Sequence, residues 1–203
     1  MSNIYTLNVR NNSTQSGSFC IFQEQPDVNM PGLITLAWLA KMSHPTTELE
    51  FKWIEDYCFV WSKTTKLEPG SIINTGQHWA ANLKTKNKIT FDYQDGAYTF
   101  EDEKQGDYEG NLYIDQTENV QPETASVGIG MSGEGTFLFA SEPNMKIIMS
   151  PRSKPIYWLI FGDFAEGEVL DITQVSEQAL KLQYDGTETM NVEFTGDNTW
   201  KII

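Results

Sequence analysis

The sequence predicts an all-β fold, an antiparallel β-sandwich of the jelly-roll or Greek-key type with at most one short helix. Aromatic residues occupy 12% of the 203 positions, and their bulky side chains favour the pleated surface of a strand. Apolar and polar residues alternate with period two in most segments, which is typical of half-buried strands. Long helical crossovers, which parallel strands require, are missing from the pattern.

The alternating segments are, in chain order, 5–9, 57–61, 89–93, 180–184 and 190–194. Two Asp-Gly pairs, Asp95-Gly96 and Asp185-Gly186, supply the positive φ angles of tight hairpin turns. A further turn at 195–198 leads into the last residues. The C-terminal quarter is therefore predicted to be a meander of three strands.

One segment is predicted with two alternatives. Leu33, Leu36, Ala37 and Ala40 fall on one face of a helix over 33–42, which Pro45 would end. A strand at 34–38 is the other interpretation. No linker or repeat divides the chain, so we predict one sandwich domain over 1–203.

The charge of the chain is strongly negative. Lys and Arg number 14 against 28 Asp and Glu, a formal net charge of -14. Such a surface repels nucleic-acid phosphate and anionic lipid, so we expect no nucleic-acid partner. Solubility explains the charge best, while a divalent cation or a basic protein partner stays open.

The cysteines and the apolar runs predict a location. Cys20 and Cys58 lie in apolar alternating runs and are predicted to be buried and reduced. The N-terminus lacks a basic region followed by an apolar run, so we expect a cytoplasmic protein, although export by another route stays open. The apolar run 157–161 is too short for a transmembrane segment.

A glycine-rich segment matches the dinucleotide-binding fingerprint in its letters only. Its key positions are Gly128, Gly130, Ser132 and Gly133. The fingerprint binds pyrophosphate only between a strand and a helix, whereas the residues at 134–140 predict another strand. We expect a glycine-rich loop or bulged strand where backbones approach closely, and no cofactor.

Catalytic and metal motifs are not found in the sequence. The two histidines, His44 and His78, have no metal-ligand spacing with each other or with the cysteines, so no metal site is predicted. Ser132 lacks the second glycine of a nucleophile elbow, because residue 134 is Glu. Acidic pairs such as Glu55-Asp56 leave acid–base hydrolysis open.

The tryptophans suggest a ligand site. Most of the six are expected in the core, but Trp79 adjoins Gln77 and His78 in a polar segment. An aromatic face with short polar neighbours is what recognition of a neutral sugar uses. We therefore name Trp79, His78, Gln77 and Trp38 as candidate ligand-binding residues.

Several segments together resemble the RhiA family of rhizosphere-induced bacterial proteins. The resemblance covers about 5–175 and rests on the segments 11–13, 16–17, 21–23, 36–38, 59–62, 67–70, 96–100, 125–133 and 167–171. It implies a soluble bacterial protein without a secretory signal, associated with population-density-regulated expression near plant roots. It implies no catalytic residues.

We therefore expect a non-enzymatic binding or interaction protein that recognises a carbohydrate or another small ligand in host or community interaction. Two alternatives remain. One is a hydrolase or isomerase that uses an Asp/Glu pair, and the other is a self-assembling or membrane-active protein. Homo-oligomerisation stays open.

Overall fold

The computed structural model describes residues 4–26, 30–64, 66–152 and 154–203. Strands dominate these ranges, and their one helix is the single turn α1 (Ile172–Val175). The prediction of an all-β, sandwich-like fold with at most one short helix is confirmed. Within the described residues, the structure contains no helix with the length and apolar character needed to cross a bilayer.

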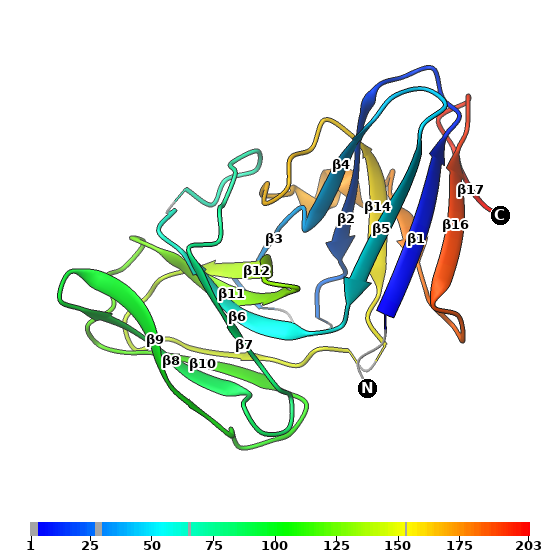
Figure 1. The fold of residues 1–203 in the computed structure, drawn as a ribbon. Coiled ribbons are helices and arrows are strands. Elements are labelled where there is room, and N and C mark those ends of the chain that lie inside the picture. The colour runs from blue at the N-terminus through cyan, green and yellow to red at the C-terminus, as the bar shows by residue number, and fades with distance from the viewer. Residues whose placement is uncertain (1–3, 27–29, 65, 153) are drawn as a thin grey trace.

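The first sandwich is built from both ends of the chain (Figure 1). One of its sheets is four-stranded, with the order β17 (Trp200–Ile202), β16 (Thr189–Phe194), β1 (Ile4–Asn11), β5 (Glu48–Ile54). The sheet that faces it has the order β15 (Leu180–Leu182), β14 (Tyr157–Gly162), β2 (Gly17–Gln23), β4 (Leu39–Ser43). Phe19 and Phe194 meet between the two sheets, with ring centroids 6.0 Å apart.

The second sandwich is built mainly from the middle of the chain. Its five-stranded sheet has the order β3 (Ile34–Thr35), β12 (Glu134–Ala140), β11 (Ser126–Met131), β6 (Tyr57–Ser62), β7 (Gln77–Ala80). The opposing sheet has the order β13 (Lys146–Met149), β10 (Leu112–Gln116), β8 (Lys88–Gln94), β9 (Ala97–Lys104). Most strand pairs are antiparallel, as predicted, but β1 with β16 and β8 with β10 are parallel.

One hydrophobic cluster runs through both sandwiches, and Trp38 lies at their junction. Its fully buried indole stacks on Tyr157 at 6.0 Å and meets Trp53 edge-on at 5.8 Å. Trp38 Nε1 donates a hydrogen bond of 3.1 Å to the carbonyl oxygen of Met131, at the end of β11. The chain is predicted as one sandwich domain, and its described residues form a pair of sandwiches that share a core.

The helical alternative for 33–42 is wrong, because this segment forms β3, a short connection and β4. Three consecutive residues explain the extended chain. Leu36, Ala37 and Trp38 are all buried, and each belongs to a different hydrophobic cluster. A helix with one apolar face could not direct neighbouring side chains into three clusters.

The C-terminal meander is only partly correct. The β16–β17 hairpin forms around 195–198, as predicted. However, β15 pairs with β14 in the opposite sheet, so the chain after Asp185-Gly186 crosses from one sheet to the other. The strand β16 lies in that other sheet because it pairs with β1 in a parallel register, with Val9 opposite Val192.

The glycine-rich segment forms the β11–β12 hairpin, and the strand predicted at 134–140 is present as β12. Ser132 and Gly133 make its turn with φ angles of 54° and 85°. The register shifts at Gly130, where a Cβ atom would lie 1.9 Å from the carbonyl oxygen of Glu134. At Gly128 a Cβ atom would lie 2.0 Å from the carbonyl oxygen of Phe137. Backbone therefore fills the space that a side chain would need.

We predict that Gly130→Ala lowers the free energy of unfolding by roughly 2–4 kcal/mol, because the added methyl group forces two strands apart. Chemical denaturation monitored by circular dichroism measures the change. Gly196→Ala is the matched control, since its Cβ would meet only the carbonyl oxygen of Asn12 at 3.7 Å. Equal stability of the two variants would contradict the proposed role of the close contact.

Candidate functional site

The three neighbouring residues predicted to bind a ligand lie on β7, at the edge of the five-stranded sheet. Strand alternation separates their side chains. Trp79 is partly buried and meets Phe100 of the opposing sheet, with ring centroids 6.3 Å apart. His78 is exposed on the other face, where a Cβ atom on Gly133 would lie 3.3 Å from its Cε1. The structure therefore does not bring these two side chains together.

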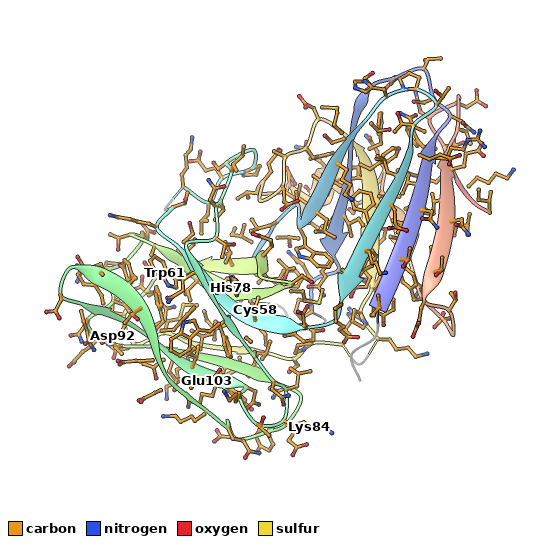
Figure 2. The ribbon with its side chains drawn as sticks, in the orientation of Figure 1. Cys58, Trp61, His78, Lys84, Asp92 and Glu103 are labelled. Atoms are coloured by element: carbon orange, nitrogen blue, oxygen red, sulfur yellow. The ribbon has the colours of Figure 1, made fainter. Side chains whose placement is uncertain are left out.

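Trp38 lies even further from such a role, because its side chain is fully buried at the junction of the sandwiches. It does not reach the surface. Gln77, in contrast, contacts a different aromatic residue. Its Oε1 accepts a hydrogen bond of 2.9 Å from Nε1 of Trp61, the residue opposite it on β6. Trp61 and His78 are labelled in Figure 2.

A cleft of about 270 Å³ opens beside Trp61. Three segments far apart in the sequence form it: the end of β6, the β8–β9 hairpin and the loop before β11. The lining residues are Trp61, Lys63, Tyr93, Gly96, Ala97, Tyr98, Gln121 and Thr124. This cleft is the best candidate site, because it combines aromatic surface with a few polar groups.

The hairpin positions two of the aromatic rings. Asp95 and Gly96 form its two-residue turn with φ angles of 51° and 83°, as the sequence predicts. In this register Tyr93 lies directly opposite Tyr98, and their ring centroids are 4.8 Å apart. The ring of Tyr98 also lies 5.8 Å from that of Trp61 and stacks on Phe91 at 5.0 Å. The aromatic wall is thus anchored in the core.

The loop that supplies the polar side of the cleft is fixed to the same ring. The hydroxyl of Tyr98 hydrogen-bonds the hydroxyl of Thr124 and lies 3.4 Å from the carbonyl oxygen of Gln121. Ser141, which directly follows β12, donates a hydrogen bond of 2.7 Å from its Oγ to the same carbonyl oxygen of Gln121. The loop therefore has a defined conformation before any ligand binds.

Asp92, labelled in Figure 2, anchors the start of the chain between β10 and β11 through Thr117 and Asn119. Its buried carboxylate accepts hydrogen bonds from the hydroxyl of Thr117, the amide of Gln94 and, at 3.2 Å, the amide of Asn119. Burial opposes ionisation, but these hydrogen bonds outweigh it and hold the pKa of Asp92 below its usual range. Asp92 is thus a structural anion rather than a ligand-facing one.

Glu55 and Asp56, the acidic pair named for acid–base hydrolysis, have different hydrogen-bond partners. Burial raises the pKa of Glu55, which accepts hydrogen bonds from Tyr5 and Tyr57. The adjacent Asp56 instead accepts from both the backbone amide and the hydroxyl of Ser132, each at 3.0 Å. The two carboxyl groups therefore serve separate structural tasks.

The two cysteine thiols are shielded from solvent. Burial raises the pKa of the Cys58 thiol to about 12, so it stays protonated at neutral pH. Cys20 and Cys58 are both buried and free. Within the described ranges, no group of three or more His, Cys, Asp or Glu side chains is placed to hold a metal ion.

Comparison with known proteins identifies the family. A family model described as RhiA matches residues 2–203. The chain belongs to the RhiA family. It is 30% identical over 201 residues to Protein RhiA of Rhizobium leguminosarum bv. viciae, covering 98% of this chain and 85% of that protein. No solved structure matches this RhiA-family chain. The match extends the resemblance beyond 175, through the C-terminal strands.

Two of the segments that carry the RhiA resemblance meet at the cleft. Trp61 comes from the segment 59–62 and Tyr98 from the segment 96–100. The sequence does not indicate Trp61, Lys63, Gln121 or Thr124 as site residues, because these positions converge only through the fold. The hairpin register could have indicated one pair, since a turn at 95–96 places Tyr93 opposite Tyr98.

We predict that Asp92→Asn lowers the free energy of unfolding by about 1–3 kcal/mol near pH 7, because an amide cannot accept all three donors. The pKa of Asp92 is lower in the folded than in the unfolded chain. Its ionised form therefore stabilises the fold above the unfolded pKa of about 4, and this contribution is lost as pH falls towards the folded pKa.

Unfolding curves between pH 2 and pH 7, compared for the wild type and the variant, measure this difference. The difference should stay constant from pH 5 to 7 and shrink below about pH 4. Asp95→Asn makes the same chemical change at an exposed turn and should alter stability by less than about 0.5 kcal/mol. A difference that is independent of pH would argue against the ionised carboxylate.

Proposed function

We propose that this RhiA-family chain is a non-enzymatic binding protein whose cleft at Trp61, Tyr93 and Tyr98 holds a carbohydrate or a similar small ring. The observation that carries the proposal is the convergence of three aromatic side chains and several polar groups on one cleft. Aromatic faces attract the C–H faces of a sugar ring, while nearby polar groups bind its hydroxyls.

The size of the cleft supports a small ligand. Its volume of about 270 Å³ lies just below the lower end of the range of about 300–1,000 Å³ that holds drug-sized molecules. One sugar ring, or the end of a longer chain, suits that space better than an extended oligosaccharide.

Two of the aromatic side chains that line the cleft are held in place by hydrogen bonds, which supports a binding site. Trp61 is held through its Nε1 by Gln77, and Tyr98 is held through its hydroxyl by Thr124. A site whose side chains are ordered in advance loses less conformational entropy when the ligand binds.

The lining also favours binding over hydrolysis. Of the described residues that line the cleft, none is Asp, Glu or His, the groups on which acid–base hydrolysis depends.

The proposal includes a biological role and a cellular location. The family suggests a role in host or community interaction. Two free, buried thiols suit a reducing compartment, which favours the cytoplasm.

We predict that the fluorescently labelled protein binds at least one sugar on a glycan array, and that Trp61→Ala weakens this binding about tenfold or more through loss of the stacking face. His78→Ala is the first control, because His78 lies outside the cleft and should leave binding unchanged. Thermal unfolding of each variant checks that the fold persists.

A second control addresses general loss of packing. Trp158 is also a partly buried tryptophan but lies in the first sandwich, so Trp158→Ala should keep the sugar signal. The proposal is wrong if the array is blank for the wild type, or if Trp158→Ala and Trp61→Ala reduce binding equally.

A further inference from the structure

Among the described residues that line the cleft, one side chain is charged, and its charge is positive. Lys63 follows β6 directly and is exposed at the cleft. Acidic residues outnumber Lys and Arg by 28 to 14 in this chain. The charge that these described lining residues present is therefore opposite in sign to the net charge of the chain.

The ammonium group of Lys63 makes no hydrogen bond or ion pair with the described residues, whereas many other lysines do. Lys86 and Lys88, for example, pair with carboxylates at 2.7 Å. Asp95 and Glu123 adjoin lining residues in the sequence, yet neither lines the cleft. The charge of Lys63 is thus available to a ligand.

The backbone that carries Lys63 is fixed. Ser62 is buried, its hydroxyl donates to Oγ1 of Thr64 at 3.1 Å, and it accepts from the Thr64 amide at 3.2 Å. This local turn holds the chain on both sides of Lys63. The side chain consequently starts from a defined point beside Trp61, and only its own rotamers must be ordered on binding.

Two of the other polar groups in the cleft are already engaged. The indole N–H of Trp61 is used by Gln77, and the hydroxyl of Tyr98 is used by Thr124. The strongest donor left for a ligand is therefore the ammonium of Lys63, which offers three N–H groups and no acceptor. Such a donor suits a carboxylate better than a neutral hydroxyl, because the charge strengthens the hydrogen bond.

We propose that the cleft selects a sugar ring that bears a carboxylate, a uronic acid, with its ring face on Trp61 and Tyr93 and its carboxylate beside Lys63. This inference rests on the proposed function and narrows it to one ligand class. Lys63 determines charge selectivity, while the aromatic rings supply affinity common to neutral and acidic sugars.

The test compares two probes that differ at one carbon, methyl β-D-glucuronide and methyl β-D-glucoside. NMR titration of the Trp61 indole N–H, assigned with Trp61→Phe, gives a dissociation constant for each. We expect the wild type to bind the acidic probe about two- to fivefold more tightly at low salt, the range of a solvent-exposed ion pair. Added salt should reduce that preference, because it screens exposed charges.

Lys63→Gln should bring the ratio of the two dissociation constants close to one. Lys84→Gln is the matched control, since it removes the same charge from an exposed turn at the far end of the second sandwich (Figure 2). It should keep the preference for the acidic probe.

The outcomes separate this inference from the proposed function. Equal binding of both probes, or a ratio that Lys63→Gln does not change, overturns charge selection while leaving the sugar site in place. Binding of neither probe at the Trp61 signal overturns the inference together with the site. A preference lost equally in both lysine variants would assign it to net charge and not to Lys63.

Discussion

The architecture depends on the backbones of β11 and β12 approaching more closely than any side chain would permit. At Gly128 and Gly130 an added Cβ atom would lie within 2.0 Å of a carbonyl oxygen of the partner strand. This contact lets β11 lie in the middle of the five-stranded sheet, hydrogen-bonded to β12 and β6. The register with β6 places Val127 opposite Trp61. Gly128 and Gly130 of β11 therefore help to fix the position of Trp61 in the wall of the cleft, although β11 itself does not line the cleft.

The same sheet is apolar on both faces, and this explains how the two sandwiches are joined. Phe59 faces the large shared cluster, whereas Val60 faces a smaller one with Leu36 and Val169. The outer face must be covered, and the chain between β3 and β4 covers it. Once Leu36 is placed there, Trp38 lies at the junction with the first sandwich. Packing on two faces thus ties the halves together without a disulfide.

The features of the fold that sequence reasoning predicts correctly are those set by neighbouring residues. Asp95-Gly96 determines a tight turn by its own φ angles, and alternation gives the strands on either side. The helix over 33–42 and the β15–β16 hairpin are wrong predictions because distant partners decide both. Residues 36–38 each pack into a different hydrophobic cluster, which excludes the helix. Pairing of β16 with β1 excludes the β15–β16 hairpin. The apolar–polar pattern of one segment does not indicate which distant segments it packs against or pairs with.

The candidate site shows the same division. The sequence presents Gln77 as a polar group beside Trp79 for the ligand, but strand pairing places it opposite Trp61, where it fixes an indole. Alternation already implies that His78 and Trp79 face opposite ways, and applying it to β7 removes the predicted platform. What no local rule supplies is the meeting of β6 with the β8–β9 hairpin across two sheets. An aromatic cleft assembled in this way becomes visible only after the strand order is known, because each ring resembles a core residue in its own segment.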